Sequence, residues 1–448
     1  MTTTNLTRRT VLGAGAAAVA LAAPFVRGAH AAGKLSVGFW DHWVPGANDV
    51  SRKLVEQWAE KEKVDTKIDF ITSTGDKLRI TIAAEAAAGS GHDVLALSTW
   101  LPGSYAEKLE PVDDVVGELI KQNGDVGKTV EYLGKASGHW IAVPTSIGTQ
   151  TKPPCGRIDL IKQHVGLDVT QMYPSGSQPN KELADKWTWD FFLQAAEKCF
   201  KAGSPFGMGL GPSSDSVDWV GAVFASHGAT MVNEKGDVTV KSDETRQVLE
   251  WFKKLAPFLP PDVFAWDDAS NNKMLVSGKA ALIMNPPSAW AVAKRDAPKV
   301  AEQLWTFASP KGPKGRFEPF LPYYWTIWNF SANKPAAKSL LTFLQQRPQV
   351  EQLVAASQGY DIPPYANMRD FKVWEEQGPP KGSIYSYPPR YPDQIPSISA
   401  APAPPKVAVQ IYTQATMTKM IAQCTQSGKT IDQAIAWAAD EIEGFMRS

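Results

Sequence analysis

The chain has 448 residues, with 46 basic and 46 acidic side chains and therefore a formal net charge of zero at pH 7. This balance argues against a nucleic-acid-binding protein, because such proteins carry a basic surface. The length exceeds what one hydrophobic core usually supports, so we expect two domains or lobes. Sixteen tryptophans recur along the chain and supply many large flat side chains.

The first thirty or so residues have the pattern of an export signal. Residues 7–12 contain the twin arginines Arg8 and Arg9, the run 13–23 is alanine-rich, and residues 29–31 read A-H-A, a cleavage site. The apolar run is too short to span a bilayer. We therefore expect residues 1–31 to be a twin-arginine signal peptide, cleaved near Ala31, and the mature protein to be free in the periplasm.

The first part of the mature chain alternates between strand and helix patterns. We expect strands at 34–40, 66–71 and 94–97, with helices at 48–61 and 75–88. This alternation predicts right-handed βαβ units and a parallel sheet. Ligands bind beyond the carboxyl ends of strands in such sheets, which points to residues 41–43, 72–76 and 98–100.

The later part of the chain is richer in helices and loops. We expect helices at 187–201, 217–227, 242–255, 407–424 and 430–446, and a strand at 280–284. Thr188 and Asp190 are candidate helix caps. Residues 310–315 alternate proline, lysine and glycine and have the composition of a linker.

Cysteines and histidines give no sign of a metal site. Cys155, Cys199 and Cys424 are widely spaced, and the six histidines are scattered. An odd number of cysteines leaves at least one thiol unpaired within a single chain. We expect the three cysteines to be core residues, and we expect no metal and no cofactor.

Residues 321–330 contain five aromatic side chains and form the most distinctive stretch of the sequence. Aromatic and β-branched residues favour a strand, in which Tyr323 and Trp325 share one face and Tyr324 lies on the other. A flat aromatic face with a polar edge suits a sugar ring, although the same rings could form sheet core. We interpret the stretch as a ligand wall, with the face that lines it left open.

Five motifs follow one another in the order found in a known family. They are S-G-H-D-V-L (90–95), L-E-P-V-D-D (109–114), G-H-W-I-A-V-P (138–144), W-T-W-D (187–190) and M-L-V-S-G-K-A-A (274–281). The order resembles the family 1 extracellular solute-binding proteins of ABC importers, which include maltose-type receptors. His92, Ile141 and Leu275 stand where the family usually has proline, tyrosine and phenylalanine.

The resemblance implies a two-lobed α/β periplasmic binding protein of type II-like architecture, with the ligand cleft between the lobes. It implies an N-terminal lobe of residues 32–146 plus 316–354 and a C-terminal lobe of 147–315 plus 355–448. Hinge crossings would fall near 146–150, 309–315 and 355–359, and closure over ligand would be hinge bending. The implied partners are the permease subunits of the transporter, and we expect a monomer that is not an enzyme.

The candidate ligand-binding residues are aromatic rings that could stack on a sugar and carboxylates that could accept hydroxyl hydrogen bonds. They are Trp40, Asp41, Trp43, Asp76, Trp100, Asp215, Trp219, Trp290, Tyr323, Tyr324, Trp325 and Tyr360. Each has a structural alternative: the aspartates could be helix caps or turn residues, and the rings could be core.

Two rival functions remain open at this point. The same fold could bind a polyamine or another small solute, with a cation boxed by aromatic rings and aspartate. An exported carbohydrate-active enzyme would also have a tryptophan-rich cleft and paired carboxylates. The adjacent acidic pairs 113–114, 267–268 and 440–441 are poor catalytic pairs, because sequence neighbours rarely face each other. We therefore expect capture of a sugar or polyol; an anionic ligand would need an arginine or a free helix N-terminus, and none is identified.

Overall fold

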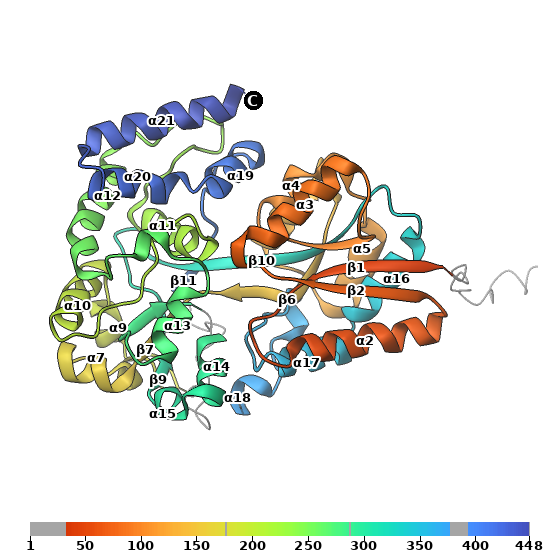
Figure 1. Ribbon diagram of the computed structural model, residues 1–448, viewed down its shortest axis with the longest axis horizontal. Coiled ribbons are helices and arrows are strands. Elements are labelled where there is room, and N and C mark those ends of the chain that lie inside the picture. Colours follow the sequence, from red (N-terminus) through yellow and green to blue (C-terminus); the bar gives the residue numbers. More distant parts are fainter. Residues whose placement is uncertain (1–32, 175–176, 286–287, 377–392, 448) are drawn as a thin grey trace, which may run out of the picture.

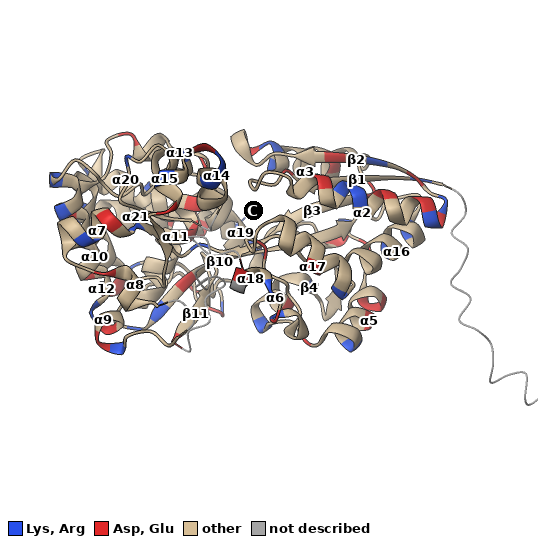
Figure 2. Ribbon diagram, turned by 90° about the horizontal axis from the view of Figure 1, so that it is seen from below, with Lys and Arg blue, Asp and Glu red and all other residues tan. Residues whose placement is uncertain are grey.

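The computed structural model of the protein describes residues 33–174, 177–285, 288–376 and 393–447. The predicted signal peptide lies outside the described residues. Two α/β lobes lie side by side and are connected by the long strands β6 and β10 (Figure 1). Basic and acidic residues are interspersed over both lobes (Figure 2), as the balanced composition predicts. No helix in the described part of the chain is both long and apolar enough to cross a membrane.

A six-stranded sheet runs through the first lobe, in the order β11-β10-β3-β1-β2, with β6 paired to β10. Its strands are β1 (Lys34–Trp40), β2 (Asp65–Ile71), β3 (Val94–Ser98), β6 (Val143–Thr151), β10 (Arg316–Ile327) and β11 (Gln394–Ser397). The helices around it are α2 (Ala47–Glu62), α3 (Lys77–Ala88), α4 (Leu101–Ser104), α5 (Asp113–Asn123), α6 (Lys128–Gly134), α16 (Lys334–Leu344), α17 (Arg347–Ala356) and α18 (Val373–Glu376). A small hairpin joins β4 (Lys135–Ala136) and β5 (His139–Trp140).

The strands and helices predicted for the first lobe are confirmed. β1 pairs in parallel with β2 and with β3, so the carboxyl ends of these three strands meet at one edge of the sheet. α2 buries Leu54, Val55 and Trp58, whose spacing places them on one helical face. β10 closes the arrangement by pairing antiparallel with β3.

The second lobe has a three-stranded antiparallel sheet in the order β8-β7-β9. Its strands are β7 (Pro154–Arg157), β8 (Leu282–Met284) and β9 (Leu304–Thr306). Its helices are α7 (Ile158–Val165), α8 (Val169–Met172), α9 (Lys181–Lys186), α10 (Trp189–Lys201), α11 (Ser214–His227), α12 (Asp243–Leu255), α13 (Ser270–Val276), α14 (Ser288–Asp296), α15 (Pro298–Ala301), α19 (Pro405–Thr413), α20 (Thr416–Thr425) and α21 (Ile431–Arg447). Cys155, Cys199 and Cys424 are buried free thiols, which confirms their prediction as core residues.

Side-chain caps fix where the helices of the second lobe begin. Thr188, Ser213 and Ser242 accept hydrogen bonds from backbone N–H groups in the first turns of α10, α11 and α12. α11 consequently starts at Ser214, earlier than the predicted 217. The single closing helix predicted at 407–424 is wrong: α19 and α20 are separate, because Ala415 adopts a left-handed conformation with φ of 53°.

The hinge consists of strands that are shared between the lobes. Residues 316–319 of β10 pair with β11, whereas residues 323–327 pair with β3. The pairing of β10 with β6 shifts register, because Leu321 lies opposite Gln150 and Tyr323 lies opposite Thr145. The extra residues, 146–149, form a bulge in β6, where the paired strands can bend. Tyr360 and Trp374 are buried in the core of the first lobe. This packing favours assigning residues 360–374 to the first lobe, whereas the sequence resemblance implied that they belong to the C-terminal lobe. The exact lobe boundaries stay a prediction.

Glu318 is a buried carboxyl group in the hinge. It lies in β10, is 2% exposed, and accepts hydrogen bonds from the Ser309 backbone N–H, the Ser309 hydroxyl and Nε2 of Gln394. Burial raises the pKa of Glu318 to about 8, although the hydrogen bonds from Ser309 act in the opposite direction. The hinge therefore contains a proton that the unfolded chain would release.

Glu318→Gln is expected to make stability less dependent on pH. The folded-state pKa lies above the usual 4.5, so the folded protein binds more protons and its stability falls as the pH rises towards 8. Between pH 6 and pH 8, the free energy of unfolding of the wild type should fall by about 2 kcal/mol more than that of the variant. Urea titrations measure this difference, with exposed Glu56→Gln as the control. Parallel pH profiles of the wild type and Glu318→Gln would contradict the assignment.

Candidate functional site

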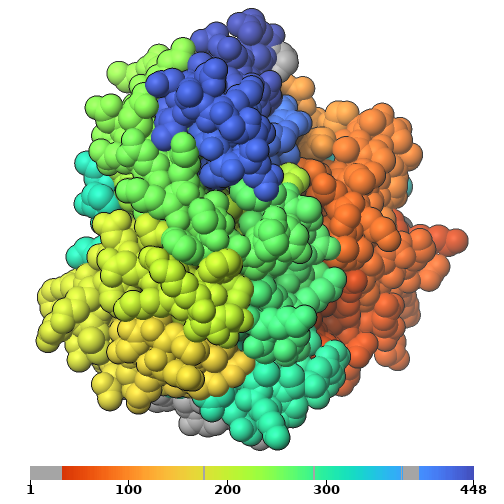
Figure 3. All heavy atoms as spheres, turned by 60° about the vertical axis from the view of Figure 1, so that its left-hand side comes forward, coloured from red at the N-terminus to blue at the C-terminus, as the bar shows by residue number. Residues whose placement is uncertain are grey.

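A cavity of about 80 Å³ lies between the two lobes. The first lobe supplies polar groups from Ser73, Asp76, Arg79, Ser98 and Tyr323, and the second lobe supplies them from Ser214, Asp268 and Tyr412. The lobes meet along a continuous seam on the face shown in Figure 3. Small-molecule pockets usually measure about 300–1,000 Å³, so a sugar would need the lobes to move apart before it could enter.

An aromatic cluster lies at the carboxyl end of β1, beside this cavity. The ring of Trp40 stacks on that of Tyr360 at 6.1 Å, meets the edge of Trp43 at 6.4 Å, and lies 5.5 Å from Tyr323. The Trp40 indole N–H donates to the hydroxyl of Ser73, 3.4 Å away. Trp43 is partly buried, whereas Trp40 and Tyr360 are 2% and 1% exposed. Tyr323 is the member of this cluster that also lines the cavity.

His42 ties the cluster to the hinge. Its Nδ1 accepts a hydrogen bond from the backbone N–H of Val44 at 2.9 Å, which places the proton of the neutral ring on Nε2. Nε2 then donates to Asp361, whose carboxylate oxygens lie 3.1 and 3.2 Å away. Asp361 also accepts from the backbone N–H of Gly148 in β6 at 2.9 Å. The loop after β1 is thereby connected to a strand that crosses between the lobes.

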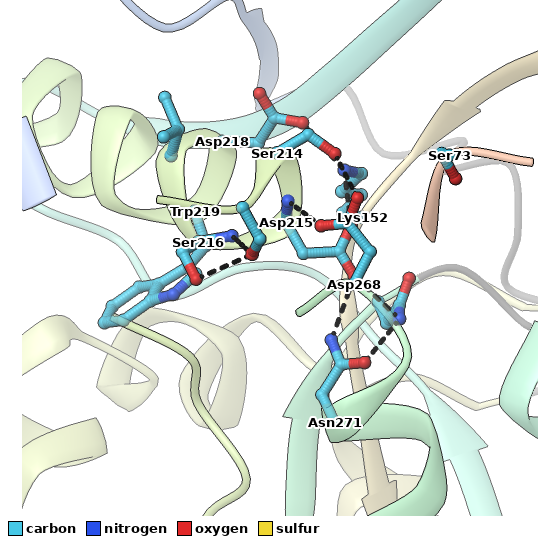
Figure 4. A network of polar contacts seen from close by, with 12 residues as sticks. Ser73, Lys152, Ser214, Asp215, Ser216, Asp218, Trp219, Asp268 and Asn271 are labelled. Carbon is cyan, nitrogen blue, oxygen red and sulfur yellow. Dashed lines mark hydrogen bonds and ion pairs between the residues drawn. The ribbon is translucent and has the colours of Figure 1, made fainter. Parts of the chain in front are cut away.

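A buried ionic network lies on the second-lobe side of the cavity (Figure 4). Lys152 is 1% exposed, and its Nζ contacts Asp215 at 2.6 Å and Asp218 at 2.7 Å. The other carboxylate oxygen of Asp215 accepts from Asn271 and Asn285, each at 3.1 Å. These bonds satisfy the buried charges, as buried ions require.

The pKa values of the network follow from burial and from the proximity of its charges. Burial alone would lower the pKa of Lys152, but Asp215, Asp218 and Asp268 together raise it above the usual value, so this lysine stays charged. Burial raises the pKa of Asp215 to about 6, with Lys152 acting in the opposite direction. Burial also raises the pKa of Asp218, again against the effect of Lys152.

Asp268 occupies the N-terminus of α11. Its carboxylate accepts from the Ser214 hydroxyl at 2.9 Å and from the Asp215 backbone N–H at 3.0 Å. A helix N-terminus attracts anions, and here a side chain of the protein itself takes that position. Among the described residues, no lysine or arginine lies within ion-pair distance of Asp268. The cavity is consequently lined by a carboxylate whose hydrogen-bond donors are neutral.

Six of the sequence-predicted residues lie at or beside the cavity. Trp40, Trp43, Tyr323 and Tyr360 form the aromatic cluster, Asp76 lines the cavity, and Asp215 belongs to the ionic network. Asp41 lies in the loop after β1 and accepts a hydrogen bond from Asn48 at 2.7 Å. The face of β10 that lines the cavity is therefore the face of Tyr323. Direct contact of these residues with a solute stays a prediction.

The other five predicted residues are buried in the lobe cores. They are Trp100, Trp219, Trp290, Tyr324 and Trp325, each at most 2% exposed. The indole N–H groups of Trp100 and Trp219 donate to the backbone carbonyls of Ser399 and Gly209, and the Tyr324 hydroxyl donates to that of Val130. The Trp325 ring stacks on Phe39 at 5.1 Å, and Lys294 lies over the ring of Trp290 at 4.6 Å. These contacts are those of packing residues.

Sequence reasoning did not identify Lys152, Asp218, Arg79 or Tyr412 as site residues. Residues 141–151 are uncharged, and Lys152 directly follows them at the end of a buried strand. A cation in that position needs a buried anionic partner, so the sequence position of Lys152 could have indicated a buried ion pair. Asp268 was weighed only as a neighbour of Asp267. The structure shows that Asp268 faces the cavity, whereas Asp267 bonds to Ser270.

The family of the chain follows from a comparison with known protein families. The model of the bacterial extracellular solute-binding proteins matches residues 45–351, well over half of the chain. The protein is a member of this family, as its motifs had indicated. A search of curated proteins found no match.

Solved structures with the same fold include several solute-binding proteins. Maltose-bound MalE3 of T. maritima superposes with a TM-score of 0.74 at 20% identity, over 92% of this chain and 99% of that chain. A solute-binding protein of Thermotoga lettingae bound with α-D-tagatose gives 0.71 at 16% identity, over 92% and 98%. One from Agrobacterium vitis with bound D-mannitol gives 0.67 at 20% identity, over 93% and 99%. At these identities the likeness establishes the two-lobed fold.

Proposed function

We propose that the protein is the solute-binding component of an ABC importer and that it captures a sugar or polyol. The observation that carries this proposal is the position of Tyr323, which belongs both to the aromatic cluster and to the lining of the interlobe cavity. Aromatic rings supply stacking surface, and the neighbouring carboxylates and hydroxyls supply partners for sugar hydroxyl groups. Solved relatives of the same fold hold maltose, tagatose or mannitol, which supports this class of solute.

The charges around the cavity argue against an anionic solute. Among the residues that the structure describes, Arg79 and Lys152 are the only cations that form ion pairs with the carboxylates of Asp76, Asp215, Asp218 and Asp268. This excess of negative charge repels carboxylates and phosphates and tolerates neutral or cationic groups. Because no cation pairs with Asp268 among the described residues, a polyamine is the second candidate solute.

The cellular setting belongs to the same proposal. We expect export through the twin-arginine signal of residues 1–31, action as a monomer in the periplasm, and delivery of the solute to permease subunits without chemical change. Membership in an extracellular family supports export, and the signal motif in the sequence supports the route.

A thermal-shift screen of the mature protein, beginning at Ala32, tests the solute class. The panel contains mono- and oligosaccharides, polyols, polyamines and sugar acids. A solute at about a hundred times its dissociation constant should add about 2.7 kcal/mol to the free energy of unfolding. We expect a neutral sugar or polyol to raise the melting temperature, and Tyr323→Ala to reduce the shift. Trp219→Phe, a change in the second-lobe core, is the matched aromatic control.

The other outcomes of the screen separate the candidate functions. A shift with polyamines alone would replace the sugar by the second candidate. A shift with sugar acids alone would contradict the charge argument. Consumption of any sugar without a thermal shift would favour the carbohydrate-active enzyme instead.

A further inference from the structure

Arg79 makes a contact between the lobes that is separate from the hinge strands. It lies on α3 of the first lobe, and its Nη1 donates to the backbone carbonyl of Thr413 at 3.0 Å. Thr413 is the last residue of α19 on the second lobe. Both residues line the interlobe cavity. One wall of the cavity is thus fastened to the other by a hydrogen bond from a cation.

The acceptor of this bond is a group that needs a partner from outside its own helix. The last carbonyls of a helix have no intrahelical donor, and they carry partial negative charge. The last turn of α19 contains no basic residue. Arg79 supplies the missing donor and a compensating positive charge from the opposite lobe.

Asp76 orients the guanidinium group of Arg79. Its carboxylate accepts a hydrogen bond from Nη2 of Arg79 at 2.6 Å. The same guanidinium group therefore contacts Asp76 and the carbonyl of Thr413 at the same time. Asp76 has φ of 59°, in the left-handed region that non-glycine residues rarely adopt. Backbone strain of this kind is found at ligand clamps and switch regions. A lysine would supply one compact charge instead of this fork of donors.

A second contact between the same regions is deeply buried and differs in character. The indole of Trp100 donates to the carbonyl of Ser399 at 2.9 Å, and both residues are 2% exposed. The side chains of Arg79 and Asp76 are 39% and 57% exposed. Exposed contacts open at lower cost than buried ones, so we expect the Arg79 contact to break before the Trp100 contact when the lobes separate.

We propose that Arg79 is a positioning residue that holds the lobes closed over the solute and slows its release. The inference deepens the proposed function and rests on it for the nature of the solute. The closed arrangement contains the Arg79–Thr413 bond and the open arrangement lacks it. Loss of the bond therefore raises the open population and the rate of solute dissociation, with little effect on association.

The proposal is tested first without any solute, by electron–electron distance measurements between two spin labels. Ala87→Cys on α3 and Lys419→Cys on α20 provide exposed label sites, and the native cysteines are buried. Arg79→Ala should shift the ratio of long to short distances about fivefold, the effect expected for a surface charge contact. Arg79→Lys should give an intermediate ratio. Lys77→Ala, which removes an exposed cation from the same helix, should leave the ratio unchanged.

Identical distance distributions for Arg79→Ala and the wild type would overturn the proposal, as would a wild type without the short distance. The second test uses maltose as the probe in stopped-flow experiments, where Arg79→Ala should raise the dissociation rate about fivefold. An equal change in the association rate would also overturn it. Because the label measurement needs no solute, failure of sugar binding in the screen leaves this test intact.

Discussion

Lys152→Met is expected to lower the free energy of unfolding by about 3–5 kcal/mol at pH 7. The change removes the only cation within ion-pair distance of Asp215 and Asp218 among the described residues, and both carboxylates are buried. Breaking a buried ion pair on one side leaves uncompensated charge in a medium of low polarity. Urea denaturation measures the loss. The loss should shrink at pH 5, where Asp215, with a pKa of about 6, takes up a proton.

Two further variants separate the buried network from lysine pairs in general. Lys201→Met removes an exposed pair with Glu197 and should cost less than about 1 kcal/mol. Combining Lys152→Met with Asp215→Asn and Asp218→Asn should recover much of the lost stability, because no unpaired charge remains. A cost below about 1 kcal/mol for Lys152→Met would show that water reaches the network.

Gly148→Ala is expected to destabilise the protein by about 2–4 kcal/mol and to weaken solute binding. Gly148 lies in the hinge strand β6 with φ of 81°, where a side chain is strained. A Cβ there would also lie 2.8 Å from Cγ of Tyr323, so the ring would have to move. The measurements are the free energy of unfolding and the affinity for the solute found by the thermal-shift screen.

Gly166→Ala is the matched control for this prediction. Gly166 has nearly the same φ, 80°, but a Cβ added there meets nothing within 4 Å. It reports the backbone strain alone, about 1 kcal/mol. The excess cost of Gly148→Ala then measures the collision with Tyr323, and it should fall in the double variant with Tyr323→Leu. Equal costs for the two glycine variants would show that the ring moves freely.

The fold of the first lobe could be predicted because its strands and helices are specified by hydrophobic patterns within short segments of the sequence. The alternation of Lys34–Trp40 and the helical spacing of Leu54, Val55 and Trp58 are visible in short windows, and both match the structure. The start of α11 was placed too late, because Ser213 acts through a single hydrogen bond that periodicity does not contain. The turn at Ala415, which separates α19 from α20, also could not be predicted from the hydrophobic periodicity.

The candidate site could be predicted only in part, for a physical reason. A tryptophan that packs inside a sheet and one in the aromatic cluster beside the cavity have the same local pattern, so Trp325 and Trp40 could not be told apart. Lys152 is 63 residues from Asp215 and 66 from Asp218, and such pairings depend on the tertiary fold. Tyr323 was found because it belongs to a strand that is locally distinctive.

The register shift between β6 and β10 has a mechanical consequence for how the protein senses its solute. The register shift between Leu321 and Tyr323 contains Pro322, which has no N–H to give to a neighbouring strand. The bending point is therefore adjacent to the ring that we expect to touch the solute. We expect the lobes to bend at this point, so that a small displacement of the Tyr323 ring accompanies a larger displacement of the outer helices. Small differences in solute shape should thus be amplified into large differences in how far the lobes close.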